Sequence, residues 1–376
     1  MLIVATTHEI STDGLGARVA ALPGFAAARA AAERAGVQAY LVGGAVRDIL
    51  LGRPALQLDL VVEGDQGLLV EALGGPAQIY DRFETATVRT ASGEVDVARA
   101  RAESYPRPGA LPEVRPAAIA EDLDRRDFTV NALAVPLADP DLLVDPHRGV
   151  DDLGAGALRV LHDGSFVDDP TRALRAARYA VRLGLEPEPR TMALLRATDL
   201  DTVSRDRVVA ELAKLAEEDD PRAGFELLGA WGLVPLGPGS GELIEAVAAL
   251  LSRPPWQGIA SRPQAVIAAI RGVDGPTAEL AGTSPGSPSA AVAIARGRSA
   301  VELALARAAG AAWLDEYVER WRDVRLAITG EDLLAAGVPE GPRVGRGLNA
   351  ALRAKLDGET AGRDDELRVA LEASGS

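Results

Sequence analysis

Several residue types are missing from this chain or scarce in it. There is no cysteine, which excludes disulfides, thiolate nucleophiles and cysteine-ligated metal sites. Lysine occurs only at Lys214 and Lys355, so nearly all of the 40 basic residues are arginine. The histidines His8, His147 and His162 are isolated and form no metal-binding motif. No apolar run reaches the roughly 18 residues of a membrane-spanning helix, and the amino terminus lacks the basic segment of a signal peptide. We therefore expect a cytoplasmic protein.

The composition is that of a globular protein large enough for more than one domain. The chain has 376 residues, of which 47% are hydrophobic and 25% charged. Its formal net charge of −15 opposes broad association with a polyanion. A local basic face could still bind RNA, and arginine suits bidentate phosphate contacts. The positions of the arginines therefore matter more than their number.

The first ~140 residues alternate β-rich and helical segments, as the residue patterns show. "QAYLV" (38–42) predicts a buried strand, and after Gly43-Gly44 the segment "AVRDILL" predicts a short helix that ends at Gly52. "LQLDLVV" (56–62) alternates, which places Gln57 and Asp59 on one face of a strand. This pattern predicts a small mixed α/β domain.

A hairpin is predicted over residues 85–100, "TATVRTASGEVDVARA", around Ser92-Gly93. Asp96 on its second strand faces away from Val95 and Val97. From about residue 151 the strand signals disappear and the periodicity is helical. The Pro/Gly/Ser-rich stretch 282–289 predicts a loop or linker. The clearest helical segments are 170–184, 207–218, 224–232, 300–321 and 352–359.

Two features point to phosphate chemistry. Carboxylates at i and i+2 of a strand point the same way, about 6.5–7 Å apart. A third carboxylate on a neighbouring strand would complete a site for two Mg²⁺ ions roughly 3.5–4 Å apart. Gly43-Gly44 between strand and helix lets the backbone approach a triphosphate, and Arg47 lies one turn further on. Either feature alone is also common in ordinary turns and solvated strands.

Four arginines follow each other at near-helical spacing in the segment 170–184. They span an arc of roughly 120° on one helix, which suits contacts with phosphates or bases. Asp169-Pro170 before them also fits an ordinary helix cap, with the arginines solvated. An Asp/Arg pair offers an acceptor beside donors, as reading the edges of cytosine and adenine requires. The arginines are Arg172, Arg175, Arg178 and Arg182.

Taken together, these motifs resemble those of a known enzyme family. The chain resembles the tRNA nucleotidyltransferases, the class II CCA-adding enzymes of the DNA polymerase β-like superfamily. The segments similar to their ordered motifs are "LVGGAVRDILLGR", "LDLVVEGD", "EDLDRRDFTVNALA", "LRVLHDGSFVDDPTRALRAARYAVRLG" and "VSRDRVVAEL". The resemblance implies a polymerase β-like α/β head with a mixed sheet, followed by all-α neck, body and tail domains. The implied bounds are 1–150 for the head, 151–215 for the neck, 216–281 for the body and 282–376 for a tRNA-binding tail.

The resemblance also implies roles for individual residues. The activity would be addition of C and A to tRNA 3′ ends from CTP and ATP with Mg²⁺. The metals would be held by Asp59, Asp96 and the residue at position 57, and the triphosphate by the Gly43-Gly44 turn and Arg47. The nucleotide and its base would meet Arg126, Asp127, Asn131, Asp169, Arg172, Arg175 and Arg178.

Gln57 departs from this pattern, because the family has aspartate at that position. Glutamine is neutral and one methylene longer, and Mg²⁺ demands close octahedral geometry, so we expect weaker metal binding. One hypothesis is an active enzyme in which Gln57 is tolerated or is compensated by a neighbouring acid such as Glu63 or Asp65. The other is a non-catalytic relative that binds tRNA or nucleotide. Within the first class, CC-adding, A-adding and poly(A) polymerase activities also remain open.

The segment "GVPEGPRVGRGLNAALRAKL" near the end predicts a second basic helix. Gly341-Pro342 would precede it, and Arg343, Arg346 and Arg353 would lie on it. A helix N-terminus with arginines binds RNA phosphates well. A capped surface helix explains the same residues equally well.

Overall fold

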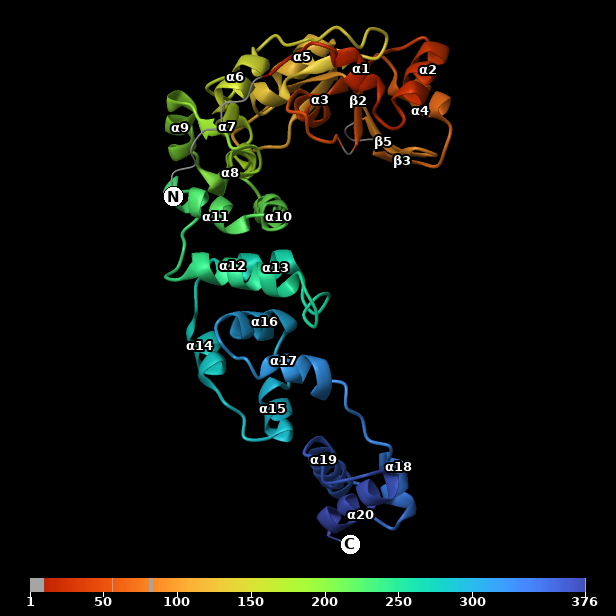
Figure 1. Ribbon diagram of the computed structural model, residues 1–376, viewed down its shortest axis with the longest axis vertical. Coiled ribbons are helices and arrows are strands. Elements are labelled where there is room, and N and C mark those ends of the chain that lie inside the picture. The colour runs from red at the N-terminus through yellow and green to blue at the C-terminus, as the bar shows by residue number, and fades with distance from the viewer. Residues whose placement is uncertain (1–9, 56, 81–83, 376) are drawn as a thin grey trace. The chain divides into compact units, whose positions relative to one another are not determined.

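The computed structural model describes residues 10–55, 57–80 and 84–375, so His8 and Leu56 lie outside the described residues. The chain forms two compact units, Met1–Val234 and Pro235–Ser376. The first is the predicted mixed α/β unit with helices after it, and the second is helical, as Figure 1 shows by its labels. In the described part of the chain, no helix is long and apolar enough to cross a membrane. The bounds of the four predicted domains remain a prediction.

A six-stranded mixed sheet forms the centre of the first unit. β2 and β5 run parallel, and all the other neighbours in the sheet are antiparallel. The predicted strand 38–42 and the hairpin are confirmed, although the turn residues are Ala91 and Ser92 because Gly93 already pairs with Thr90. The order across the sheet is β3 (Ala77–Tyr80), β4 (Thr85–Thr90), β5 (Gly93–Arg99), β2 (Leu58–Glu63), β1 (Gln38–Val42) and β8 (Ala134–Pro136).

Alternation along β2 decides which side chains reach the functional face. Leu58, Leu60 and Val62 are buried, whereas Asp59 on the other face is only half-buried. Further along that face Val61 is buried in a hydrophobic core with residues of α5. The helices around the sheet are α1 (Leu15–Ala20), α2 (Phe25–Ala35), α3 (Gly44–Leu50), α4 (Gln66–Leu73) and α5 (Ile119–Asp124).

Two small sheets and a series of helices complete the first unit. β9 (Ala157–Leu158) pairs in parallel with β10 (Glu186–Pro187), which corrects the expectation that strands end near residue 151. Strands of two residues are too short to show a period of two, so the sequence pattern could not reveal them. β6 (Arg101–Ser104) pairs with β7 (Glu113–Pro116). The helices are α6 (Gly149–Ala155), α7 (Ser165–Asp168), α8 (Thr171–Leu183), α9 (Pro189–Arg196), α10 (Arg205–Ala216) and α11 (Pro221–Ala230), with 3₁₀ turns at Thr129–Asn131 and Leu200–Thr202.

The helix α8 presents two different faces. Most of its apolar residues are buried, and the helix packs against α10 and α11. Its four arginines lie on the side that lines the large cavity described below. The spacing of the sequence predicts this division, because residues three and four apart share a face of a helix.

The second unit is built from helices, several of which begin at short polar caps. Ser261, Asp274 and Ser287 each accept a backbone hydrogen bond at the start of a helix, with proline in the first turn. The predicted helix 300–321 is interrupted near Gly310 and ends in a π-helical turn, Tyr317–Trp321. The helices are α12 (Ser240–Leu251), α13 (Arg262–Ala269), α14 (Gly275–Gly282), α15 (Pro288–Ala295), α16 (Ala300–Ala308), α17 (Leu314–Glu316), α18 (Gly330–Ala335), α19 (Pro342–Leu356) and α20 (Arg363–Ser374).

Two predictions for the second unit can be compared with these elements. The stretch 282–289 joins α14 to α15, and α15 already begins at Pro288. The predicted basic helix near the end is α19, on which Arg343, Arg346 and Arg353 are exposed. Helices α18, α19 and α20 share a small apolar core that includes Leu333.

Candidate active site

Asp59 and Asp96 are direct neighbours on adjacent strands. The parallel register pairs Asp59 of β2 with Asp96 of β5. Both carboxylates therefore lie on one face of the sheet, and both line the same cavity of about 350 Å³. Burial and, next, the charge of Asp96 raise the pKa of the Asp59 carboxyl, while Arg126 opposes the shift. Thr87 donates a hydrogen bond of 2.6 Å to Asp96 Oδ1.

This pair fits a hard divalent cation, because such ions prefer oxygen ligands. Gln57 immediately precedes β2, is exposed, and lines the large cavity together with Asp59. Its amide oxygen is a possible ligand without charge. Within residues 10–55, 57–80 and 84–375 there is no group of three or more His, Cys, Asp or Glu residues that could hold a metal ion. The donor set at this site is thus two carboxylates and one amide.

The two acids expected to compensate for Gln57 are held elsewhere. Glu63 lies at the far end of β2, roughly 13 Å along the strand from Asp59, where its carboxylate accepts a hydrogen bond from the backbone of Ile119. Asp65 caps α4 by accepting from Gly67 N at 2.8 Å. The hypothesis that either acid compensates is wrong, because both carboxylates belong to local structure away from the site.

The turn between β1 and α3 places two glycines and an arginine at the cavity. Gly43 has a φ of 66°, which favours glycine. Arg47 is almost fully buried, and it donates to Asp48 Oδ1 at 2.8 and 2.9 Å and to Asn131 Oδ1 at 2.5 Å. The guanidinium that was expected to meet a triphosphate is therefore already oriented by two partners.

Arg126, Asp127 and Asn131 surround the same part of the cavity. Arg126 Nη2 donates to Asp122 Oδ2 at 3.0 Å. Asp127 Oδ1 accepts from Asn131 Nδ2 at 2.9 Å, and its Oδ2 lies 3.6 Å from Arg175 Nη1. Burial alone would raise the pKa of Asp127, but Arg175 and the hydrogen bonds hold it below its ordinary value.

The Asp/Arg group at the start of α8 is a connected network. Asp169 accepts from Thr171 N at 3.0 Å, but the N-cap of α8 is Pro170, so the cap predicted at Asp169 is displaced by one residue. It is also paired with Arg175 at 3.1 Å and with Arg207 of α10 at 2.9 Å. Arg172 donates to Ser165 Oγ at 3.0 Å and to the backbone oxygen of Arg125 at 2.7 Å. The alternative of solvated arginines is wrong for these residues, since the structure holds them at the cavity wall.

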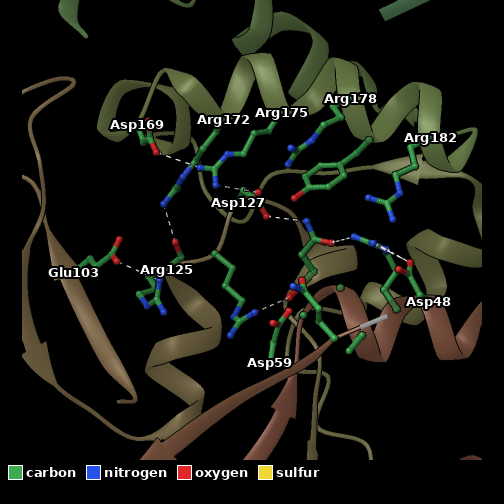
Figure 2. A pocket seen from close by; sticks show the side chains of 18 of the residues that line it. Asp48, Asp59, Glu103, Arg125, Asp127, Asp169, Arg172, Arg175, Arg178 and Arg182 are labelled. Carbon is green, nitrogen blue, oxygen red and sulfur yellow. Dashed lines mark hydrogen bonds and ion pairs between the residues drawn. The ribbon is translucent and has the colours of Figure 1, made fainter. Parts of the chain in front are cut away.

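Most of the predicted site residues line one cavity of about 800 Å³ in the first unit, and Figure 2 shows how labelled members such as Asp59, Asp127 and Arg175 converge on it, whereas Asp96 lines only the smaller cavity. The cavity wall carries eight arginines against five carboxylates, so its charge suits an anionic ligand. The arginines are Arg47, Arg101, Arg125, Arg126, Arg172, Arg175, Arg178 and Arg182, and the carboxylates belong to Asp48, Asp59, Glu103, Asp127 and Asp169.

Some of the lining residues were not expected from the sequence. Tyr179 of α8 stands between two cations, with Arg47 Cζ 5.5 Å and Arg178 Cζ 5.2 Å from its ring centroid. Tyr179 directly follows Arg178 in the sequence, so its position could have indicated that it lies near the arginine face, but the spacing of the arginines does not take it into account. Arg125 and Glu103 form an ion pair of 3.1 Å at the wall, and neither belonged to a predicted constellation.

The two described histidines lie outside this cavity. His147 Nε2 is 2.7 Å from Asp124 Oδ1, and His162 is 3.9 Å from Asp168. Burial lowers the pKa of His162, and Arg172 adds to the shift. Neither histidine lines the cavity, so the site chemistry belongs to its carboxylates and arginines.

Comparisons with known proteins agree with this geometry. Residues 39–159 match the family model described as the poly A polymerase head domain. A CC-adding tRNA nucleotidyltransferase of Deinococcus radiodurans is 38% identical over 343 residues, which cover 89% of this chain and 88% of that protein. An A-adding tRNA nucleotidyltransferase of Halalkalibacterium halodurans is 45% identical over 202 residues, which cover 50% of this chain and 47% of that protein. The chain thus spans about half the length of the second relative.

Solved structures of CCA-adding enzymes have the same fold. An apo form gives a TM-score of 0.81 at 27% identity, covering 98% of this chain and 99% of that one. A complex with ATP gives 0.77 at 27% identity with the same coverage. The Thermotoga maritima enzyme complexed with tRNA gives 0.70 at 26% identity, covering 95% and 98%. With a relative this similar along nearly its whole length, the chain belongs to the tRNA nucleotidyltransferase family, a family of nucleotidyl-transferring enzymes.

Proposed function

We propose that this protein adds C and A nucleotides to the 3′ end of tRNA from CTP and ATP. The observation that carries the proposal is the cavity of eight arginines with Asp59 in its wall and Asp96 beside Asp59 on the next strand. Such a wall suits a triphosphate, and the carboxylate pair suits the cation that accompanies it. Similar structures complexed with tRNA and ATP support these substrates. A cytoplasmic location stays a prediction.

In this reaction the 3′ hydroxyl of the tRNA attacks the α-phosphorus of the nucleotide. A new P–O bond forms, the bond to the β-phosphate oxygen breaks, and pyrophosphate leaves. Polymerase β-like enzymes generally use divalent metals, and the metal proposed here is Mg²⁺. When bound, Mg²⁺ would favour ionisation of the attacking hydroxyl and neutralise phosphoryl charge. Asp59 and Asp96, with the amide of Gln57, would hold it.

The other site residues bind and orient the nucleotide in this proposal. The backbone of Gly43 and Gly44 at the start of α3, with Arg47, would contact the triphosphate. Arg126, Asp127 and Asn131 would border the sugar. Asp127 supports this role because its carboxylate is ionised and fixes the amide of Asn131 by hydrogen bonding.

The base would be selected at the start of α8. Asp169 supplies acceptor oxygens beside the guanidinium donors of Arg172, with Arg175 and Arg178 continuing the surface. Hydrogen bonds within the protein already fix both partners, so a base that pairs with them meets groups of settled orientation. A fixed acceptor beside fixed donors favours the edges of cytosine and adenine over bases with other patterns.

Gln57 supports a second candidate, a relative that binds tRNA or nucleotide without transferring it. Loss of one carboxylate lowers the negative charge available to a dication, which weakens the metal site while leaving the arginine wall intact. A third candidate, within the enzyme class, is CC-adding, A-adding or poly(A) polymerase activity. Relatives named CC-adding and A-adding both match this chain, so similarity alone does not separate these activities.

Extension of a tRNA that lacks its CCA end tests the first two candidates. Wild type, Gln57→Asp and Asp59→Asn are compared with labelled CTP and ATP in Mg²⁺. The proposal expects extension by wild type and a loss of at least about 100-fold in Asp59→Asn. A silent wild type rescued by Gln57→Asp would instead establish the impaired relative. Reactions with CTP alone, ATP alone and both, on tRNA ending before or after CC, separate the three partial activities.

A further inference from the structure

The smaller cavity, of about 350 Å³, adjoins the large one at Asp59. Asp59 lines both cavities, but Asp96 lines only the smaller one. The carboxylate pair that the proposed function assigns to the reaction therefore lies where the two cavities meet. The other residues that line both are Gly43, Gly44, Arg101, Arg125 and Arg126.

The smaller cavity gives the second substrate of the proposed reaction a place. A displacement at phosphorus brings the attacking oxygen in line with the leaving group. If the nucleotide fills the large cavity, the 3′ hydroxyl of the tRNA has to approach its α-phosphorus from a different side. The smaller cavity contains both carboxylates and so offers that approach. Its three arginines against two carboxylates also suit the backbone phosphate of an RNA end.

Tyr80 stands on the same face of the sheet as the two carboxylates. Tyr80 of β3 pairs with Thr85 of β4, and Thr85 pairs with Ala98 of β5. Directly paired residues share a face of the sheet. Ala98 lies two residues beyond Asp96, so it also shares the face of that carboxylate. The side chain of Tyr80 is therefore directed to the functional face, and Tyr80 lines the smaller cavity.

Tyr80 is placed where it can meet a base. It is 47% exposed, and β3 is an edge strand of the sheet. Strand spacings of about 4.8 Å and a rise of about 3.4 Å per residue put its Cα roughly 12 Å from that of Asp96. The sugar and base of one nucleotide, together with the length of a tyrosine side chain, span such a distance. Exposed aromatic rings stack on unpaired bases in many RNA-binding proteins.

We propose that Tyr80 binds the 3′ end of the tRNA by stacking on its last base in the smaller cavity. This inference rests on the proposed function, since it places the second substrate of the same reaction. Stacking tolerates every base, which suits an end whose last base changes with each addition. Tyr80 thus holds the attacking hydroxyl near Asp59 and Asp96 and leaves the choice of the incoming base to α8.

A tRNA that lacks its CCA end and carries 2-aminopurine as its last base tests this inference. Its binding requires no turnover, so the outcome does not depend on Gln57. Stacking on an aromatic ring quenches 2-aminopurine, so the bound tRNA should fluoresce less with wild type and Tyr80→Phe than with Tyr80→Ala. Loss of one base–aromatic stack corresponds to about 5–150-fold in affinity. We expect Tyr80→Ala to bind this tRNA about 10-fold more weakly and, in extension assays, to raise KM for tRNA but not for CTP.

Ile79→Ala is the matched control for this experiment. Ile79 precedes Tyr80 on β3, is 62% exposed and faces the opposite side of the sheet. This variant should keep the wild-type fluorescence and affinity. If it loses as much as Tyr80→Ala, the edge strand and not the ring binds the tRNA end, and the inference is overturned.

Two further outcomes separate this inference from the proposed function. Equal fluorescence and affinity in wild type and Tyr80→Ala would overturn the inference, while extension by wild type would leave the proposed function standing. If wild type neither binds nor extends the tRNA, the inference and the proposed function fall together.

Discussion

The guanidinium of Arg126 occupies the space into which any side chain at Gly43 would project. A Cβ at Gly43 would stand 2.7 Å from Arg126 Nη1, and the φ of Gly43 is 66°. Arg126 itself is held by Asp122 and by a 3.4 Å hydrogen bond to the backbone oxygen of Asn131. The turn before α3 and the arginine over it are thus fitted to each other.

This fit predicts the effect of Gly43→Ala. With a φ of 66° and a ψ of −126°, an alanine here should cost about 1–3 kcal/mol of unfolding free energy, and the clash should displace Arg126 from the cavity. We expect nucleotide affinity to fall about 10-fold, which corresponds to about 1.4 kcal/mol. Thermal unfolding and titration with a CTP analogue measure the two effects.

Gly52→Ala is the matched control for this prediction. Gly52 has the same φ of 66°, and a Cβ there would meet no atom within 4 Å. It should lose similar stability and keep its nucleotide affinity. Equal affinity losses in both variants would show that backbone strain, and not the contact with Arg126, controls binding.

Asp122 anchors two arginines of the cavity wall. Its side chain is fully buried and accepts from Arg125 at 2.7 Å and from Arg126 at 3.0 Å. Removing one partner from a buried ion pair leaves uncompensated charge and costs about 3–5 kcal/mol. We expect Asp122→Asn to lose about 3 kcal/mol of unfolding free energy at neutral pH.

The pH dependence of this loss follows from the pKa of Asp122. Burial would raise that pKa, but Arg125 and Arg126 outweigh it and hold the pKa below its ordinary value. A carboxyl whose pKa is depressed by folding stabilises the folded state at pH values above its unfolded-state pKa of about 4. This stabilisation is lost as the pH falls through the lower pKa of the folded state. The gap between wild type and Asp122→Asn should therefore narrow in urea unfolding below about pH 4. A constant gap from pH 7 to pH 3 would contradict the role of the ionised carboxylate.

Periodicity and turn residues predicted those parts of the site that a single continuous segment of the chain forms. The strand at 38–42, the glycine turn, the hairpin and the arginine face of α8 follow from periodicity and turn residues alone. The pairing of Asp59 with Asp96 depends on a parallel register between segments more than thirty residues apart, which periodicity does not encode.

Residues that reach the cavity from other elements were also beyond the sequence patterns. Arg207 on α10 contacts Asp169 from 38 positions away, and Arg125 contacts Glu103 from 22. Ordinary surface helices carry arginines at the same spacing, so only packing shows which of them line a cavity. A family resemblance supplies motifs but not these partners.

Tyr179 should act through its ring and not through its hydroxyl. The ring packs edge-on against Phe128, with centroids 5.8 Å apart, and lies between the guanidinium groups of Arg47 and Arg178. Tyr179→Phe keeps these contacts and should retain stability and nucleotide affinity. Tyr179→Ala should lose about 3 kcal/mol of stability and bind nucleotide more weakly, because both cation–π contacts disappear. A loss in Tyr179→Phe equal to that in Tyr179→Ala would assign the role to the hydroxyl instead.

Arg207 should influence which base is accepted, because it fixes Asp169 from outside α8. Its Nη2 donates to Asp169 Oδ1 at 2.9 Å, and its Nη1 donates to the backbone oxygen of Gly109 at 2.9 Å. Arg207→Ala would leave Asp169 with Arg175 and Thr171 but with a less restricted carboxylate. If Asp169 reads the base, the ratio of kcat/KM for CTP over UTP should fall about 10-fold, which is about 1.4 kcal/mol of lost discrimination.

Measuring both nucleotides separates positioning from a general defect in this variant. Arg205→Ala, an exposed arginine on the same helix, is the control and should keep the wild-type ratio. A positioning role requires kcat/KM for CTP to drop while that for UTP holds or rises. If both values fall by the same factor, Arg207 supports only the packing of α10 and the loop at Gly109, and base choice must depend on the remaining partners of Asp169.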